Sequence, residues 1–92
     1  MNPSITENEK LYAEERYIEL IKKIRKYMTA DTSLLRDAFD TAMEKHKCRR
    51  RKGGAPYISH PLEVAHFCAD MRRDNEVIAA ALLHDVVEDF WA

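Results

Sequence analysis

Apolar residues recur at helical spacing through the first part of the chain, with glutamate and lysine between them. From about residue 8 to residue 28 the apolar positions are Tyr17, Leu20, Ile21, Ile24 and Met28. Steps of three and four residues place such side chains on one face of a helix. The pattern therefore predicts a leading amphipathic helix over residues 8–28.

A second helical stripe follows after a short polar segment. Asp31, Thr32 or Ser33 can accept a hydrogen bond from the first free backbone N–H groups and cap this helix. The stripe contains Leu35, Ala38, Phe39, Ala42 and Met43. His46 continues it, so we interpret His46 as a packed or hydrogen-bonded histidine and not as a metal ligand.

Glycine and proline interrupt the helical pattern in one interior region, residues 53–61. The segment RRRKGGAPYIS, residues 49–59, is therefore predicted to be a basic loop. Pro61 suits the first position of a third helix over residues 61–72, with His60 as its N-cap. The inward face of this helix is expected to contain Leu62, Ala65 and Ala69. Its polar stripe is expected to contain Glu63, His66 and Asp70, with His66 solvated.

Asp74 or Asn75 can cap a fourth helix, whose sequence is EVIAAALLHDVVED. This segment is apolar nearly all round, which is typical of a central, buried helix. The sequence shows neither an internal repeat nor the alternation of a strand. The predicted fold class is all-α, a bundle of about four helices.

Composition is that of a soluble globular domain. The 92 residues suffice for one small domain or part of a larger one, with 46% hydrophobic and 34% charged residues. A net charge of −1 argues against a general DNA or membrane partner. The basic run at residues 45–52 has no interleaved aromatics for base stacking. Cys48 and Cys68 form no CxxC pair, and no stretch is long enough to span a bilayer, so we expect a cytoplasmic protein.

The third and fourth helices should bring distant residues together. At about 1.5 Å per residue, the third is about 18 Å long, and the fourth is about 15 Å long from its cap to His84. A short turn between them predicts antiparallel packing. His60 would then begin one helix near the level where His84 ends the other.

Four ionisable residues close the fourth helix. His84 lies four positions before Glu88, and the same spacing separates Asp85 from Asp89. Each pair therefore shares one line of the helix surface. Together with His60, the adjacent His84 and Asp85 could bind one divalent cation.

Two nitrogens and one oxygen suit a borderline cation, and added carboxylate and water favour manganese, iron or magnesium over a structural zinc. Such an ion lowers the pKa of a bound water and so promotes hydrolysis. Glu88 or Asp89 could then transfer protons or position the water. The alternative is a solvated helix end. Carboxylates in a last turn oppose the helix dipole at about 0.3–1 kcal/mol each, which favours the metal site if the helix ends there.

Two segments carry a resemblance to a known family. GGAPYISHPLEVA, residues 53–65, and DNEVIAAALLHDVVED, residues 74–89, closely resemble the N-terminal hydrolase domain of RelA/SpoT homologues. Those enzymes belong to the HD phosphohydrolase superfamily, named for an adjacent histidine and aspartate. The resemblance covers about residues 32–89 and is strongest in 51–65 and 79–89.

The resemblance implies that residues 1–92 form a single partial HD domain. It implies manganese-dependent hydrolysis of guanosine tetra- and pentaphosphate, (p)ppGpp, with release of the 3′-pyrophosphate. By matching position, the metal ligands would be His60, His84 and Asp85. Glu88 and Asp89 would activate water and organise the site.

The same resemblance assigns Arg51 to stacking on the guanine, and guanidinium stacking on a purine is physically reasonable. Lys52 would contact the base or a phosphate. Arg49 stands where the family usually has glutamine. Tyr57 could pack the loop or touch ribose, and packing is the favoured interpretation.

In the family, further helices follow the position of Asp89 and supply another aspartate ligand. Here Asp89 is followed by Phe90, Trp91 and Ala92, so we expect the sequence to be part of a longer hydrolase. Apolar groups at this end, Val86, Val87, Phe90 and Trp91, suggest a missing continuation or a partner surface.

Three hypotheses remain open at the level of sequence. The chain is the N-terminal part of an alarmone hydrolase, or a non-catalytic metal-binding relic or regulator that pairs with a full-length homologue. In the third, a small HD enzyme with another phosphorylated substrate is completed by self-association.

Overall fold

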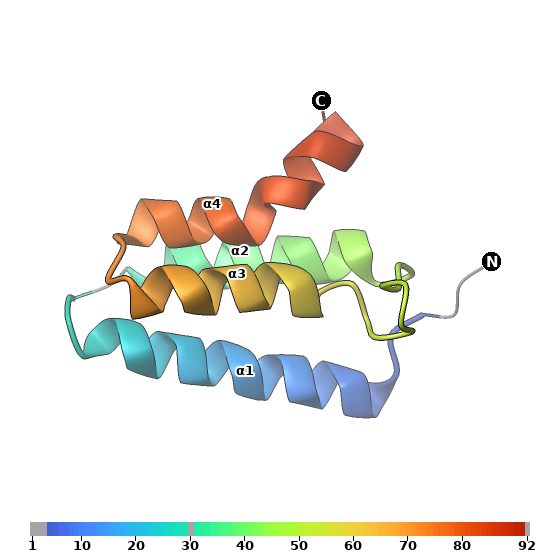
Figure 1. The fold of residues 1–92 in the computed structure, drawn as a ribbon, viewed down its shortest axis with the longest axis horizontal. Coiled ribbons are helices and arrows are strands. Elements are labelled where there is room, and N and C mark those ends of the chain that lie inside the picture. The colour runs from blue at the N-terminus through green and yellow to red at the C-terminus, as the bar shows by residue number, and fades with distance from the viewer. Residues whose placement is uncertain (1–3, 30, 92) are drawn as a thin grey trace.

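The computed structural model describes the backbone of residues 4–29 and 31–91, and the side chains of residues 4–29 and 31–89. Over this part of the chain it shows α1 (Glu7–Arg25), α2 (Thr32–His46), α3 (Ser59–Asp70) and α4 (Asn75–Val86), followed by a short π-helix, η1 (Val87–Trp91). The described residues form no β-strand, only an isolated bridge between Arg50 and Pro56. The predicted all-α fold is confirmed (Figure 1).

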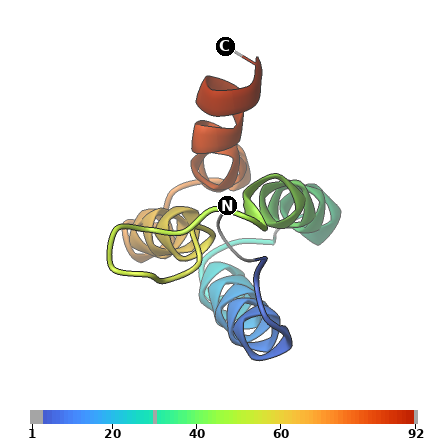
Figure 2. The same ribbon diagram turned by 90° about the vertical axis from the view of Figure 1, so that its right-hand side faces the viewer.

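The helices pack as a bundle with α1 and α4 at opposite corners. Figure 2 views the bundle end-on and shows α2 and α3 on either side between them. α4 packs against both α2 and α3, and α1 packs against α3. The residues that meet in the centre are largely those of the predicted stripes, among them Leu20, Ile24, Leu35, Phe39, Leu62, Ala65, Ile78 and Leu82.

Side-chain caps begin three of the helices where the sequence has its polar residues. Asp31 accepts a hydrogen bond from the Ser33 N–H, and Asp74 accepts one from the Val77 N–H. Both were among the predicted caps. Thr6 and Glu9 form a reciprocal capping box at the start of α1. α1 ends at Arg25, earlier than the predicted residue 28.

The predicted start of the third helix is wrong. α3 begins at Ser59 with Ile58 as its N-cap residue, so His60 is not the cap and Pro61 is not the first helical residue. The backbone already turns before the proline, because Ser59 N donates to Pro56 O and His60 N to Tyr57 O. Proline is tolerated throughout a first turn because those N–H groups have no intrahelical partner.

His66 is buried, which contradicts the predicted solvated stripe. α1 covers this side of α3, and the imidazole is only 4% exposed. Its Nε2 donates to the backbone carbonyl of Arg16 at 2.8 Å. Burial lowers the pKa of His66, so the neutral imidazole is favoured.

α4 is not buried all round, which corrects another expectation. One face is in the core, through Ile78, Ala79, Leu82 and Val86. Val77 lies on the outer side and is exposed, as is Val87 just after the helix. The hydrophobic character of this segment on all sides predicted a central helix. In the described part of the chain, α4 instead lies on one side of the bundle.

Candidate metal centre

The antiparallel packing of α3 and α4 brings the start of one to the end of the other (Figure 1). His60, in the first turn of α3, places its Nε2 atom 3.6 Å from Oδ2 of Asp85 in the last turn of α4. His60 and His84 were predicted to lie at the same level of the bundle. The contact that the structure gives is from His60 to the neighbour of His84.

His84, Asp85 and Glu88 form a compact group of possible metal ligands. One ligand atom from each lies within 4.8 Å of the others. The His84 and Glu88 side chains are well exposed, and the Nε2 of His84 is 3.9 Å from Oε1 of Glu88. Asp85 is the most protected of the three, with its side chain 16% exposed. The sequence paired His84 with Asp85 as ligands but gave Glu88 a catalytic role only.

The helix changes type inside this group. The α-helical hydrogen bonds of α4 give way at Val87 to the wider π-helix η1, which contains Glu88 and Asp89. Figure 1 shows that the chain bends away from the axis of α4 at this point. A π-segment inserts an extra residue per turn, is a common cause of a sharp bend, and recurs at functional sites. The sequence analysis predicted a continuous α-helix to Asp89 and did not predict the π-helix.

Asp89 is held by an arginine of the basic loop. Nη1 of Arg49 donates to Oδ2 of Asp89 at 2.6 Å. The same guanidinium lies over the ring of Tyr57, 4.1 Å from its centroid. Arg49 therefore connects the loop to η1.

Tyr57 joins the loop to the metal group. Its hydroxyl donates to Oδ2 of Asp85 at 3.0 Å. Its ring lies 4.8 Å from the buried ring of His46 and meets that of His60 edge-on at 5.9 Å. Burial, followed by the bond to Asp85, raises the pKa of Tyr57, which keeps the hydroxyl protonated as a donor. His46 is packed in the core as predicted, and burial lowers its pKa.

Arg51 and Lys52 lie in the tight turn that precedes α3. The backbone N–H of Arg51 donates to the carbonyl of Ala55, and the N–H of Gly54 donates to the carbonyl of Arg51. The φ of Gly54 is 97°, a conformation that favours glycine. Lys52 is exposed in this turn.

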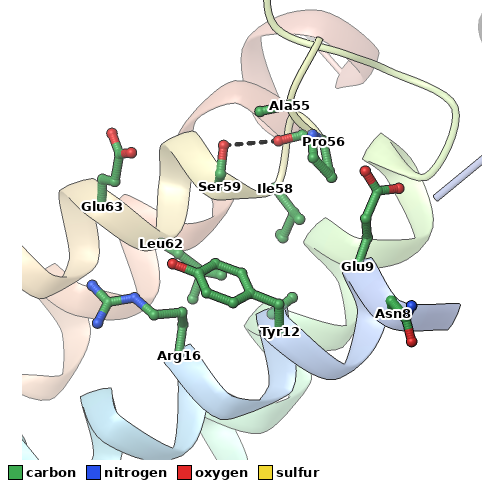
Figure 3. Close-up of a pocket in the computed structure, with 11 residues that line it drawn as sticks. Asn8, Glu9, Tyr12, Arg16, Ala55, Pro56, Ile58, Ser59, Leu62 and Glu63 are labelled. Atoms are coloured by element: carbon green, nitrogen blue, oxygen red, sulfur yellow. Dashed lines mark hydrogen bonds between the residues drawn. The ribbon is translucent and has the colours of Figure 1, made fainter. Parts of the chain in front are cut away.

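The Arg51 side chain points toward α3. Nη1 of Arg51 is 3.2 Å from Oε1 of Glu63 and 3.4 Å from Oγ of Ser59. Ser59 and Glu63 line a pocket of about 350 Å³ between α1 and α3, shown in Figure 3. Tyr12 and Leu62 line the same pocket. The structure thus places Arg51 at the edge of this pocket, and the described ion pairs do not connect it to Asp85 or His60.

The donor set fits a divalent cation. The group combines an imidazole of His84 with carboxylates of Asp85 and Glu88, while the predicted ligand His60 lies outside it and contacts it through Asp85. Mixed nitrogen and oxygen ligands suit manganese, iron or zinc more than calcium. Tyr57 supplies a second contact to one of these carboxylates, as outer partners of metal ligands commonly do.

Arg49 and Tyr57 are the site residues that the sequence reading did not single out for these roles. Arg49 was noted only as a departure from the family pattern, and Tyr57 was favoured as a packing residue. Their contacts with Asp89 and Asp85 depend on the tertiary position of the loop, which helical periodicity does not predict.

Comparison with known proteins identifies the family. A family model described as HD domain matches residues 38–92. This match covers more than half of the sequence, and the chain belongs to the HD domain family.

Curated relatives narrow the lineage. "GTP pyrophosphokinase rsh" of Brucella melitensis biotype 1 is 45% identical over 78 residues, which are 84% of this chain and 10% of that protein. "Bifunctional (p)ppGpp synthase/hydrolase RelA" of Mycobacterium tuberculosis is 46% identical over 63 residues, which are 68% and 8%. The predicted relationship to RelA/SpoT homologues is confirmed. The chain spans about a tenth of the length of these relatives.

Among the residues that the structure describes, no helix combines the length and apolar character needed to cross a bilayer.

Proposed function

We propose that this chain is the N-terminal part of a metal-dependent (p)ppGpp 3′-pyrophosphohydrolase. The observation that carries the proposal is the contact of His60, on α3, with Asp85, which forms a compact group with His84 and Glu88 at the end of α4. The name of the mycobacterial relative, a (p)ppGpp synthase/hydrolase, supports the substrate class. Residues 1–92 would form one partial HD domain, acting in the cytoplasm.

His60, His84 and Asp85 would hold the metal, for which we propose Mn²⁺. When bound, the ion lowers the pKa of a water so that it can attack phosphorus at neutral pH. Glu88 lies close enough to His84 to add a fourth donor or to accept the proton of that water. The exposure of His84 and Glu88 leaves this side of the group open to a ligand.

Asp89 has a different position from Glu88. Its carboxylate is paired with Arg49, which fixes it at the start of the loop and offsets part of the negative charge of η1. We propose that Asp89 organises the site through this pair while Glu88 handles protons.

Arg51 and Lys52 would bind the nucleotide. Both lie in the turn that precedes α3, so they can approach a substrate that extends from the metal group along the loop. Arg51 would have to exchange Glu63 for the guanine, and that exposed ion pair is weak enough to exchange.

One observation favours a second candidate. An apolar groove of about 590 Å³ between α3 and α4, lined by Val64, Val77 and Val87, opens beside His60 and His84. A second copy of the chain covering it would complete a small HD enzyme with another phosphorylated substrate. The predicted contribution of Phe90 and Trp91 to this surface lies outside the described side chains.

The test is Mn²⁺-dependent release of pyrophosphate from guanosine tetraphosphate. The 92-residue chain is compared with Asp85→Ala, and with Asp70→Ala as a matched surface control. Release that is lost only in Asp85→Ala supports the proposal. Binding of Mn²⁺ by a folded chain without release would favour a non-catalytic, metal-binding role. Release from another nucleotide alone, or only in a dimer, would favour the second candidate.

A further inference from the structure

Asp85 differs from the other acids of the metal group in its surroundings. Its side chain is 16% exposed, compared with 61% for Glu88 and 40% for Asp89. A carboxylate with little access to water must receive hydrogen bonds from the protein to remain ionised at low cost. Among the described side chains, the hydroxyl of Tyr57 donates such a bond to Oδ2 of Asp85 at 3.0 Å. The Nε2 of His60, at 3.6 Å, is too distant for a strong bond.

Tyr57 is itself fixed from several directions. The Arg49 guanidinium lies over its ring at 4.1 Å from the centroid, the His46 ring lies tilted beside it at 4.8 Å, and the His60 ring lies edge-on at 5.9 Å. Its backbone N–H donates to the carbonyl of Arg49 at 3.0 Å. These contacts leave the ring little freedom to rotate about its side-chain bonds. The position of its hydroxyl is therefore set by the fold of the loop.

The bond leaves Asp85 able to bind an ion. An ionised carboxylate offers about four lone-pair directions on two oxygens, and Tyr57 uses one of them, on Oδ2. His60 Nε2 lies 3.6 Å from the same Oδ2, and one ligand atom each of His84, Asp85 and Glu88 lies within 4.8 Å of the others, so Asp85 keeps acceptor positions for an ion beside these side chains. A donor on one oxygen restricts the rotation of the carboxylate and so limits the directions of its remaining lone pairs.

We propose that Tyr57 is a positioning residue, whose hydroxyl orients the Asp85 carboxylate as a metal ligand. The proposal rests on the metal-binding role of Asp85 in the proposed function. It assigns to the loop a part in metal affinity that is independent of substrate. It also explains why a tyrosine, not an apolar ring, fills this position: packing alone would need no hydroxyl.

Tyr57→Phe tests this because it removes the hydroxyl and keeps the ring in contact with Arg49 and His46. Tyr27→Phe is the matched control. Its hydroxyl donates to the Arg73 carbonyl at 2.6 Å, at the end of the bundle opposite to the metal group. Both variants lose one hydroxyl and one hydrogen bond. Only the first loses a bond to a proposed ligand.

The measurement is the dissociation constant for Mn²⁺, obtained from the electron paramagnetic resonance signal of free Mn²⁺ in titrations of each protein. Circular dichroism and the thermal midpoint without metal establish that each variant is folded. We expect Tyr57→Phe to bind Mn²⁺ about 10–100-fold more weakly than the wild type, as is typical when an outer partner of a ligand is lost. Tyr27→Phe should bind within about twofold of the wild type, because its hydroxyl lies outside the metal group.

Equal affinity in the wild type and Tyr57→Phe would overturn the positioning role while leaving the metal site intact. Equal weakening in both variants would also overturn it, because loss of a hydroxyl anywhere would then suffice. If the folded wild type binds no Mn²⁺, the metal site fails and the proposed function fails with it. The three results are distinguishable within one set of titrations.

Discussion

The imidazole of His60 lies 3.6 Å from the carboxylate of Asp85, although the two residues belong to different helices. The contact exists because α3 and α4 pack side by side in antiparallel directions (Figure 1). A histidine at the start of one and an aspartate at the end of the other are therefore fixed by backbone geometry. Neither residue lies in the mobile middle of a loop, which is the arrangement that a precise metal site needs.

The pair Tyr17 and Phe39 should dominate the stability of the bundle. Their rings stack at 4.7 Å, and Phe39 is fully buried. Phe39→Ala should lower the free energy of unfolding by about 3–5 kcal/mol, through lost transfer energy and the cavity left behind. Urea denaturation measures this difference. Phe67 is 64% exposed, so Phe67→Ala should change it by less than about 0.5 kcal/mol. Similar losses in both would contradict the assigned core.

His66 should make the protein less stable in mild acid. Burial lowers the pKa of His66 below its ordinary value of 6.5. Between the lowered pKa and 6.5 the unfolded chain binds more protons than the folded one, so the stability is present above pH 6.5 and is lost as pH falls below it.

His66→Gln provides the comparison, because its amide can still donate to the Arg16 carbonyl but does not titrate. We expect urea denaturation to show a smaller loss between pH 7.5 and pH 5.5 in this variant than in the wild type. A residual loss is expected because burial also lowers the pKa of His46. Identical pH profiles would show that His66 does not carry the effect.

Arg72 occupies a position that favours glycine. It follows the end of α3 with a φ of 56°, and Arg73 N closes the turn onto Cys68 O. The left-handed conformation costs a residue with a side chain about 1 kcal/mol or more. Arg72→Gly should therefore raise the free energy of unfolding by up to about 1 kcal/mol, less the entropy that glycine adds to the unfolded chain.

Arg73→Gly is the control, since Arg73 is not among the residues with positive φ. It should lower the stability by about 0.4–1 kcal/mol, because glycine only adds freedom to the unfolded chain there. Thermal unfolding of both variants measures the two changes. A loss of stability in Arg72→Gly equal to that in Arg73→Gly would contradict the strain assigned to Arg72.

The parts of the fold that follow from local chemistry could be predicted from the sequence. Asp31 and Asp74 cap helices because a short polar side chain before an apolar stripe has few other roles. The proximity of His60 to the end of α4 could be predicted because the third and fourth helices have similar lengths and are joined by a short turn. The hydrophobic pattern gave wrong predictions where the exposure of a side chain depends on tertiary packing. Burial of His66 depends on α1 crossing a stripe that looks polar, and the one-sided exposure of α4 depends on its place at a corner of the bundle.

In the candidate site, too, local features could be predicted from the sequence and tertiary contacts could not. His84 and Asp85 are adjacent in the sequence, so their pairing could be predicted. The π-helix that contains Glu88 and Asp89 could not, because the spacing of apolar side chains does not distinguish it from an α-helix. The contacts of Arg49 with Asp89 and of Tyr57 with Asp85 form only when the loop of residues 49–59 packs against the end of α4 and the start of η1. Arg51 was assigned by resemblance, and its bond to Glu63 depends on the register of the turn with α3.

The central claim is that the α3–α4 junction binds one divalent cation through Asp85. Isothermal titration of Mn²⁺ into the wild-type chain, Asp85→Asn and Asp70→Asn tests it most directly. Asp70 is a surface acid paired with Lys23 at 2.9 Å, so its loss leaves the junction unchanged. We expect one Mn²⁺ per chain in the wild type and Asp70→Asn, and affinity reduced by more than about tenfold in Asp85→Asn. Equal binding by all three proteins would contradict the metal site.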